Sequence, residues 1–153
     1  MQIHIDRLEV LSSDALTLLN EYYEAIDVTL RDTPETLSAL LADPQNGLWL
    51  AYGDSAPLGC VVLRPLPSIP QALECKRLYV RPQARGIGLA AMLMHTLEDF
   101  AAEQGAQWIY LDSKDDLDAA RALYRSLGYQ PCERYNDNPQ ATIFLRKQLP
   151  PAS

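Results

Sequence analysis

Residues 74–91 bring together residue types that could hold a phosphate group. The segment reads E-C-K-R-L-Y-V-R-P-Q-A-R-G-I-G-L-A-A, so a β-rich run is followed by a loop with two glycines and an apolar helical pattern. The first turn of a helix has backbone N–H groups without intrahelical partners, and the helix dipole adds partial positive charge. Gly86 and Gly88 would let these groups approach an anion, while Arg81 and Arg85 add formal charge. The segment therefore predicts a ligand that carries phosphates.

Other interpretations of the glycine loop are open at this point. Gly86, Gly88 and Ala91 also satisfy a dinucleotide-binding fingerprint, with Asp112 about where a ribose-binding acid would lie. That fingerprint needs its glycines directly after the strand, whereas five residues separate Val80 from Gly86. A Walker A loop is excluded because no Gly-Lys-Ser/Thr follows. A helix that merely starts after a glycine turn, with no ligand, is a further alternative.

The loop spacing Gln83-x-x-Gly86-x-Gly88 resembles the Q/R-x-x-G-x-G/A pyrophosphate loop of the GNAT N-acetyltransferase superfamily. Two flanking segments resemble this superfamily as well. Residues 76–82 are similar to its splayed fourth strand, and residues 120–129, which read A-R-A-L-Y-R-S-L-G-Y, are similar to its A-x-x-L-Y-x-x-x-G-F/Y segment. The three segments occur in the family's order, so the resemblance implies that the phosphate-bearing ligand is acetyl-CoA.

The resemblance also implies which residues bind acetyl-CoA and which fold presents them. The binding residues would be Leu78, Tyr79, Val80, Gln83, Arg85, Gly86, Ile87, Gly88, Leu89 and Ala90. The fold would be α+β with three layers (α/β), around a mixed, mostly antiparallel central sheet whose fourth and fifth strands splay apart. We expect a single domain over residues 1–149 and a tail over residues 150–153.

Hydrophobic periodicity, turn residues and helix caps predict elements in the order that the resemblance implies. Strands are expected over residues 2–10, 48–52, 58–66, 73–80, 108–112, 130–135 and 141–147. Helices are expected over residues 13–28, 34–42, 88–104 and 117–127.

Acetyl transfer to an amine requires a base, stabilisation of the carbonyl oxygen and support for the departing thiolate. Glu74 is the only acid in a basic strand segment and matches the base glutamate of some family members, although it could instead pair with Lys76 or Arg77. The resemblance places the amide that stabilises the carbonyl oxygen near Leu78, where a β-bulge would free backbone groups. Tyr124 would support the thiolate, since a phenol with a pKa of about 10 can donate a hydrogen bond; a packing role is its alternative.

The acceptor is expected to be a small, cationic amine. Residues 1–63 contain ten acids but only two Lys or Arg residues, and negative charge attracts cations. Alternatively, these acids lie on exposed helices and serve only to keep the protein soluble. Residues 135–139 resemble a Y-x-x-N-P turn of a group of GNAT proteins, which makes Tyr135 and Asn138 candidate acceptor contacts.

Composition limits the remaining possibilities. The chain has 153 residues, 48% apolar and 22% charged, which is typical of one globular domain. A net charge of −7 argues against a nucleic-acid partner, and no apolar run is long enough for a membrane partner. Three cysteines without a C-x-x-C pair favour a cytoplasmic protein without a metal. Both a monomer and a homodimer are compatible with this sequence.

Two rivals to an enzyme share some of these features. One is a non-catalytic acyl-CoA-binding or sensing domain of the same fold, and the other is a nucleotide-binding module. The presence of both Glu74 and Tyr124 favours the enzyme. We therefore expect an acetyl-CoA-dependent N-acetyltransferase in which the amine attacks directly within a ternary complex.

Overall fold

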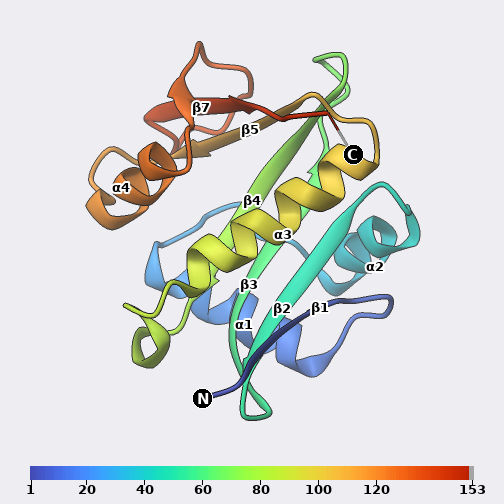
Figure 1. Ribbon diagram of the computed structural model, residues 1–153, viewed down its shortest axis with the longest axis vertical. Helices are drawn as coiled ribbons and strands as arrows, with labels where there is room; N and C mark the ends of the chain where they lie inside the picture. Colours follow the sequence, from blue (N-terminus) through green and yellow to red (C-terminus); the bar gives the residue numbers. More distant parts are fainter. Residues whose placement is uncertain (152–153) are drawn as a thin grey trace.

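Within residues 1–151, which this computed structural model describes, the chain forms one sheet of seven strands and four α-helices (Figure 1). The strands are β1 (Ile3–Arg7), β2 (Gly47–Gly53), β3 (Ala56–Pro65), β4 (Ala72–Val80), β5 (Trp108–Ser113), β6 (Gln130–Pro131) and β7 (Ile143–Gln148). The helices are α1 (Ser13–Ala25), α2 (Pro34–Ala42), α3 (Leu89–Glu103) and α4 (Asp118–Ser126), with a short 3-10 helix η1 (Pro82–Ala84).

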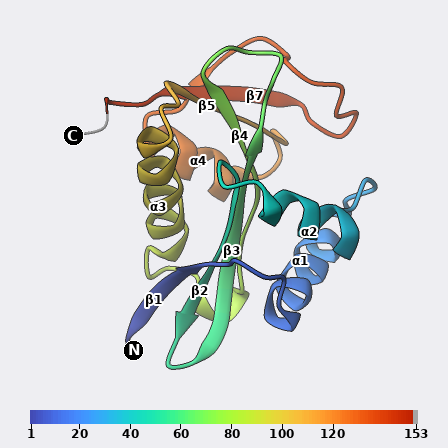
Figure 2. The ribbon, with the colours of Figure 1, turned by 90° about the vertical axis from the view of Figure 1, so that its right-hand side faces the viewer.

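The sheet order is β1-β2-β3-β4-β5-β7-β6, and only the β4–β5 pair is parallel among these strands of residues 1–151. Figure 2 shows α1 and α2 on one face of the sheet and α3 and α4 on the other. Each face has its own apolar core: one lies between the sheet and α1 and α2, the other between the sheet and α3 and α4. The expected mixed, mostly antiparallel sheet in a three-layer fold is confirmed.

Local sequence signals set the starts of the two helices on the first face. The Ser12 hydroxyl accepts the N–H of Ala15 at 3.2 Å and caps α1. Thr33 accepts the N–H of Thr36 at 3.1 Å, and Pro34 occupies the first position of α2, where its missing N–H costs nothing. Because these caps satisfy N–H groups that would otherwise lack partners, both helices start where the sequence predicts.

The sheet opens between β4 and β5. These strands pair only from Ala72 to Glu74 on β4, opposite Trp108 to Tyr110 on β5, so the rest of β4 has no neighbour on that side. The register between β3 and β4 shifts between Cys60 and Val62 of β3, and opposite them Arg77 of β4 has a left-handed φ of +60°. Two residues of β4 thus oppose one of β3, which is a β-bulge. The splayed fourth and fifth strands are therefore confirmed, and the bulge lies at residues 77–78.

Several predicted boundaries were wrong at the C-terminal end. The strand expected over residues 130–135 contains only Gln130 and Pro131, and β7 begins at Ile143 instead of residue 141. Proline offers no N–H to a ladder, which limits the strand. The guanidinium of Arg134 instead donates to the carbonyls of Asn138 and Ala141, at 3.1 and 3.2 Å, and folds the following segment into a loop.

Other differences are small. The first strand ends at Arg7 instead of residue 10, and α1 ends at Ala25 instead of residue 28. Of the expected tail over residues 150–153, residues 152–153 lie outside the described part. Among residues 1–151, no helix combines the length and the apolarity needed to cross a bilayer.

Candidate active site

A cleft of about 990 Å³ lies where β4 and β5 separate, and its lining has two parts. The loop half is formed by the end of β4, the loop after it, the first turn of α3 and one side of α4: residues 78–80, 84–86, 88–91, 119, 120, 123 and 124. The polar half is formed mainly by charged and amide side chains: Arg31, Asp32, Arg64, Lys76, Arg77, Asp112, Lys114, Asn136, Asp137, Asn138 and Gln140.

The loop half presents a row of unpaired backbone donors. Within the described chain, the N–H groups of residues 86–91 donate to no acceptor. Gly86 and Gly88 have φ values of +86° and +81°, a left-handed conformation that favours glycine, and a Cβ at either would meet no other atom within 4 Å. The space beside them is therefore open, and these N–H groups and the N-terminus of α3 suit a pyrophosphate.

Of the two arginines near this loop, only Arg85 is placed to contact a phosphate. Arg85 lines the cleft, and its Nε donates to the carbonyl of Val80 at 3.1 Å. Arg81, which was expected to add charge to the phosphate site, instead binds the Glu21 carboxylate at 3.0 and 2.7 Å and does not line the cleft. That part of the prediction was wrong, because the ion pair with Glu21 neutralises the Arg81 charge.

Some of the other residues predicted to bind acetyl-CoA line the cleft, and others do not. Leu78, Tyr79, Val80, Leu89 and Ala90 line the cleft. Gln83 and Ile87 are exposed and lie outside its lining. For the latter two, contact with acetyl-CoA stays a prediction.

The edge of β4 continues the row of available backbone groups. Beyond Glu74 this strand pairs with β3 alone, so its other edge faces the cleft without a partner strand. The bulge at residues 77–78 turns this edge, and Leu78 lies at the opening. Such an edge can hydrogen-bond an extended amide-bearing chain as an added strand would.

Tyr124 offers the loop half a phenol. It is 7% exposed and lines the cleft, and its ring packs edge-on against Tyr129, with centroids 5.8 Å apart. Within the described chain its hydroxyl has no hydrogen-bond partner, whereas the Tyr129 hydroxyl donates to Glu98 at 2.8 Å. Burial raises the pKa of Tyr124 well above its ordinary value, so the group stays protonated and able to donate.

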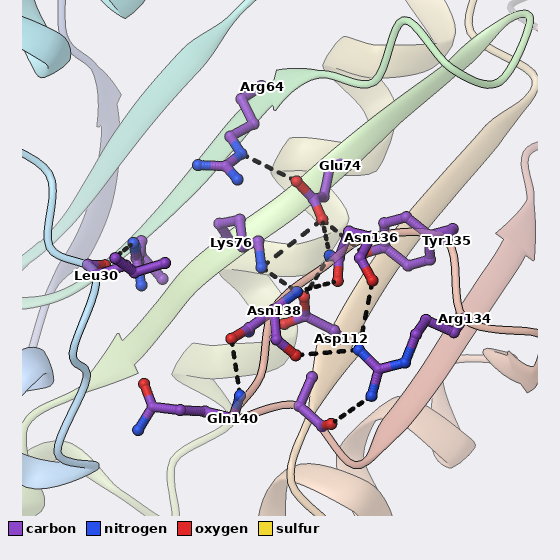
Figure 3. A network of polar contacts seen from close by, with 12 residues as sticks. Leu30, Arg64, Glu74, Lys76, Asp112, Arg134, Tyr135, Asn136, Asn138 and Gln140 are labelled. Atoms are coloured by element: carbon purple, nitrogen blue, oxygen red, sulfur yellow. Dashed lines mark hydrogen bonds and ion pairs between the residues drawn. The ribbon is translucent and has the colours of Figure 1, made fainter.

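Glu74 is buried at the junction of β4 and β5, and its carboxylate is surrounded by donors (Figure 3). One oxygen accepts Nε of Arg64 at 2.9 Å. The other accepts the hydroxyl of Tyr135 at 2.7 Å and the amide of Asn136 at 3.1 Å, with the Lys76 ammonium 3.7 Å away. Glu74 does not line the large cleft but lines an adjoining pocket of about 620 Å³. Its role as a base stays a prediction.

Asp112, at the end of β5, lines the cleft and shares two of these partners. Its carboxylate accepts the Lys76 ammonium and the Asn136 amide, each at 2.6 Å. Burial by itself would raise the pKa of Asp112, but the charge and hydrogen bond of Lys76 and the Asn136 amide outweigh it and hold the pKa below its ordinary value. Asn136 thus links the two buried carboxylates across the opening of the sheet.

The two predicted acceptor contacts lie on either side of this network. Asn138 lines the large cleft, whereas Tyr135 lines the adjoining pocket. Among residues 1–63, all of which the structure describes, Asp32 is the only acid in the cleft lining. The other acids of that segment lie outside this lining, and a cationic acceptor stays a prediction.

Comparison with known proteins agrees with this geometry. The model of the Acetyltransferase (GNAT) family matches residues 13–129. The chain belongs to the GNAT family. An uncharacterized N-acetyltransferase of Schizosaccharomyces pombe is 33% identical over 143 residues, which cover 89% of this chain and 87% of the relative.

Solved structures of the GNAT family superpose over almost the whole chain. An acetyltransferase from Staphylococcus aureus has a TM-score of 0.83 at 17% identity and covers 97% of this chain and 100% of its own. A PaiA N-acetyltransferase from Thermoplasma acidophilum, solved with coenzyme A, has a TM-score of 0.77 at 16% identity, covering 97% of this chain and 99% of its own. At these identities the likeness shows the fold.

Sequence reasoning missed several residues of this GNAT cleft. Arg64, Lys76 and Asn136 were not predicted as site residues, and Asp112 was considered only as a ribose ligand. An acid and a lysine two residues apart in one strand, Glu74 and Lys76, were an available signal, because side chains at that spacing lie on the same face of the strand and buried charges need partners. Nothing local indicated that Asn136 would join Glu74 to Asp112.

Proposed function

We propose that this protein transfers the acetyl group of acetyl-CoA to the nitrogen of a small amine, by direct attack in a ternary complex. The observation that carries the proposal is the loop half, where the N–H groups of residues 86–91, the unpaired β4 edge and the phenol of Tyr124 face one cleft. Membership of the GNAT family and the CoA-bound relative of the same fold support the choice of acetyl-CoA.

In this proposal the loop half binds the donor through its backbone. The N–H groups after Arg85 and the helix dipole of α3 receive the pyrophosphate, and Arg85 adds positive charge. The free edge of β4 hydrogen-bonds the pantetheine amides. A backbone N–H at the bulge, near Leu78, receives the carbonyl oxygen of the thioester and stabilises its negative charge as the amine attacks.

The remaining steps concern protons. The acceptor arrives as an ammonium ion and must lose a proton before its nitrogen can attack the carbonyl carbon. When the carbon–sulfur bond breaks, the Tyr124 phenol hydrogen-bonds or protonates the departing thiolate. The products are the N-acetylated amine and CoA.

Glu74 is the proposed final proton acceptor, and its contacts indicate how a proton would reach it. Glu74 is 3% exposed and lies outside the lining of the large cleft, so an amine bound in that cleft would not touch its carboxylate directly. The hydroxyl of Tyr135 donates to Glu74 and can pass a proton to it while accepting one from the amine or from water. We therefore propose a relay through Tyr135 in place of direct contact.

The test is acetyl-CoA-dependent thiol release in the presence of a panel of amines, amino acids, polyamines and peptides. The proposal expects release that depends on both the acceptor and the protein, together with calorimetric binding of CoA. Binding of CoA without release for any acceptor would instead support a non-catalytic acyl-CoA-binding domain.

A further inference from the structure

In the polar half of the cleft, the buried acids have hydrogen-bond partners, whereas part of one arginine side chain does not. The acids there already have cationic partners: Asp112 accepts Lys76 at 2.6 Å, and Asp32 faces Nε of Arg77 at 3.4 Å. The other acids of the cleft lining are exposed to water: Asp116, Asp118 and Asp137. A second positive charge on an acceptor would therefore find no buried carboxylate free to receive it.

Arg64 presents the opposite situation. Its Nε donates to Glu74 at 2.9 Å, while its two Nη atoms donate to no acceptor in the part of the chain that the structure describes. Figure 3 shows this single contact at the edge of the network. The side chain is 36% exposed and lines both the large cleft and the adjoining pocket, so Arg64 lies where the two spaces meet.

The position of Arg64 relative to the bulge sets the size of a molecule that could use it. Arg64 pairs with Glu74 across the β3–β4 ladder, and Glu74 lies four residues before Leu78. Four residues of regular strand span about 13 Å, and the bulge at residues 77–78 shortens this distance. One small molecule can therefore reach from the Arg64 guanidinium to the thioester carbon near Leu78.

We propose that the acceptor carries a carboxylate in addition to its amine, and that the Nη atoms of Arg64 bind that carboxylate. This inference rests on the proposed function and names the acceptor class: amino acids or similar compounds with both groups. A guanidinium edge matches the two oxygens of a carboxylate, and such paired, charge-assisted hydrogen bonds are stronger than neutral ones. Glu74 holds the guanidinium in place through Nε, which makes Arg64 a preorganised receptor.

The first experiment compares matched acceptors that differ only in the carboxylate: phenylalanine with phenethylamine, alanine with ethylamine, and lysine with cadaverine. Thiol release from acetyl-CoA gives kcat/KM for each. The carboxylate-bearing member of a pair is expected to exceed its partner by about tenfold or more, since a site built for hydrogen bonds rejects an analogue that lacks them. Equal values, or higher values for the simple amines or cadaverine, would overturn the inference while leaving the proposed function intact.

The second experiment tests Arg64 itself. Arg64→Lys keeps a positive charge for Glu74 but removes the planar pair of donors. It should raise KM for the preferred carboxylate-bearing acceptor about tenfold more than for its decarboxylated partner, in which any loss reports the altered contact with Glu74, and it should leave acetyl-CoA affinity unchanged. Arg125→Lys, at an exposed position of α4, is the matched control and should behave as wild type. An equal loss for both members of a pair would indicate a structural effect and contradict the proposed contact.

A binding experiment distinguishes failure of the carboxylate site from failure of the proposed acetyl transfer. If no acceptor gives thiol release although CoA binds, the same amino acids are titrated into the CoA-loaded protein by calorimetry. Binding that weakens in Arg64→Lys but not in Arg125→Lys would support the carboxylate site. Absence of binding by all of the amino acids, or equal binding by both variants, would overturn it.

Discussion

The two halves of the cleft are built from different parts of the chain. The loop half relies on backbone groups from one continuous stretch, the end of β4 through the first turn of α3, with Tyr124 as its one phenol from elsewhere. The polar half relies on side chains from β3, β4, β5 and three loops, joined by hydrogen bonds between residues far apart in the sequence; Asn136 and Glu74, for example, are 62 residues apart.

This difference determines how sensitive each half of the cleft is to amino-acid substitution. Backbone donors are present whatever the side chains are, so the loop half depends mainly on glycines and on where α3 begins. The polar half changes its chemistry with each substitution in any of its strands or loops. We therefore expect substitutions in the loop half to affect every acceptor equally, and substitutions in the polar half to depend on acceptor and pH.

The largest effect should come from Tyr124→Phe, which tests whether the loop half needs one side chain in addition to its backbone. Loss of the hydroxyl should lower kcat by about 10²–10⁴-fold, the usual range for a proton donor, with little change in acetyl-CoA affinity. Steady-state kinetics and calorimetry measure the two. Tyr129→Phe is the control, because that hydroxyl binds Glu98 outside the cleft, so it should lower stability more than kcat. Wild-type turnover in Tyr124→Phe would leave Tyr124 a packing residue.

Gly86→Asp tests the backbone part of the same half. It places a Cβ and a negative charge at a left-handed position beside the proposed pyrophosphate, and CoA affinity should fall on the order of 10²-fold. Gly105→Asp is a close control: Gly105 has φ +87° and an equally open surrounding, but ends α3 away from the cleft. Equal CoA affinity in the two folded variants would show that residues 86–91 are not the phosphate site.

Glu74→Gln tests whether the polar half removes the proton. If Glu74 is the base, the rate near pH 7 should fall about tenfold to a hundredfold and recover as rising pH supplies free amine. The measurement is kcat/KM against pH. Glu98→Gln controls for the loss of a buried glutamate, since Glu98 binds Tyr129 and Lys147 outside the cleft. A rate that is lowered by the same factor at every pH would assign Glu74 a positioning role.

The smallest predicted effect is that of Asp112→Asn on the stability of the fold. Because the folded pKa of Asp112 is lowered, its ion pair with Lys76 stabilises the fold above the unfolded pKa of about 3.9 and is lost as pH falls through the folded pKa. The variant should lose about 1.5 kcal/mol of unfolding free energy at pH 7, with a smaller difference from wild type at pH 3. Urea unfolding at both pH values measures this. A difference that does not change with pH would contradict the charge-based explanation.

The same contrast explains what the sequence could predict. The helix starts at residues 13 and 34 follow from local patterns and the splayed strands from the family resemblance, and the structure confirms both, although the first helix is capped by Ser12 instead of residues 13–14. The ion pair that occupies Arg81 could not be predicted, because its partner Glu21 lies 60 residues away. For the same reason the contacts of Glu74 with Arg64 and Asn136, which are distant in the sequence, were missed, whereas the alternative pairing of Glu74 with nearby Lys76 is present at 3.7 Å.

The bulge in β4 also reverses the alternation of side chains along the strand. Before it, Leu73 and Cys75 face the core under α3; after it, Leu78 and Val80 do, and Tyr79 faces the core under α1. A regular strand would have placed Leu78 and Val80 on the same face as Glu74. An insertion or deletion of one residue here would therefore exchange the faces of everything up to the loop, whereas a change of two would preserve them.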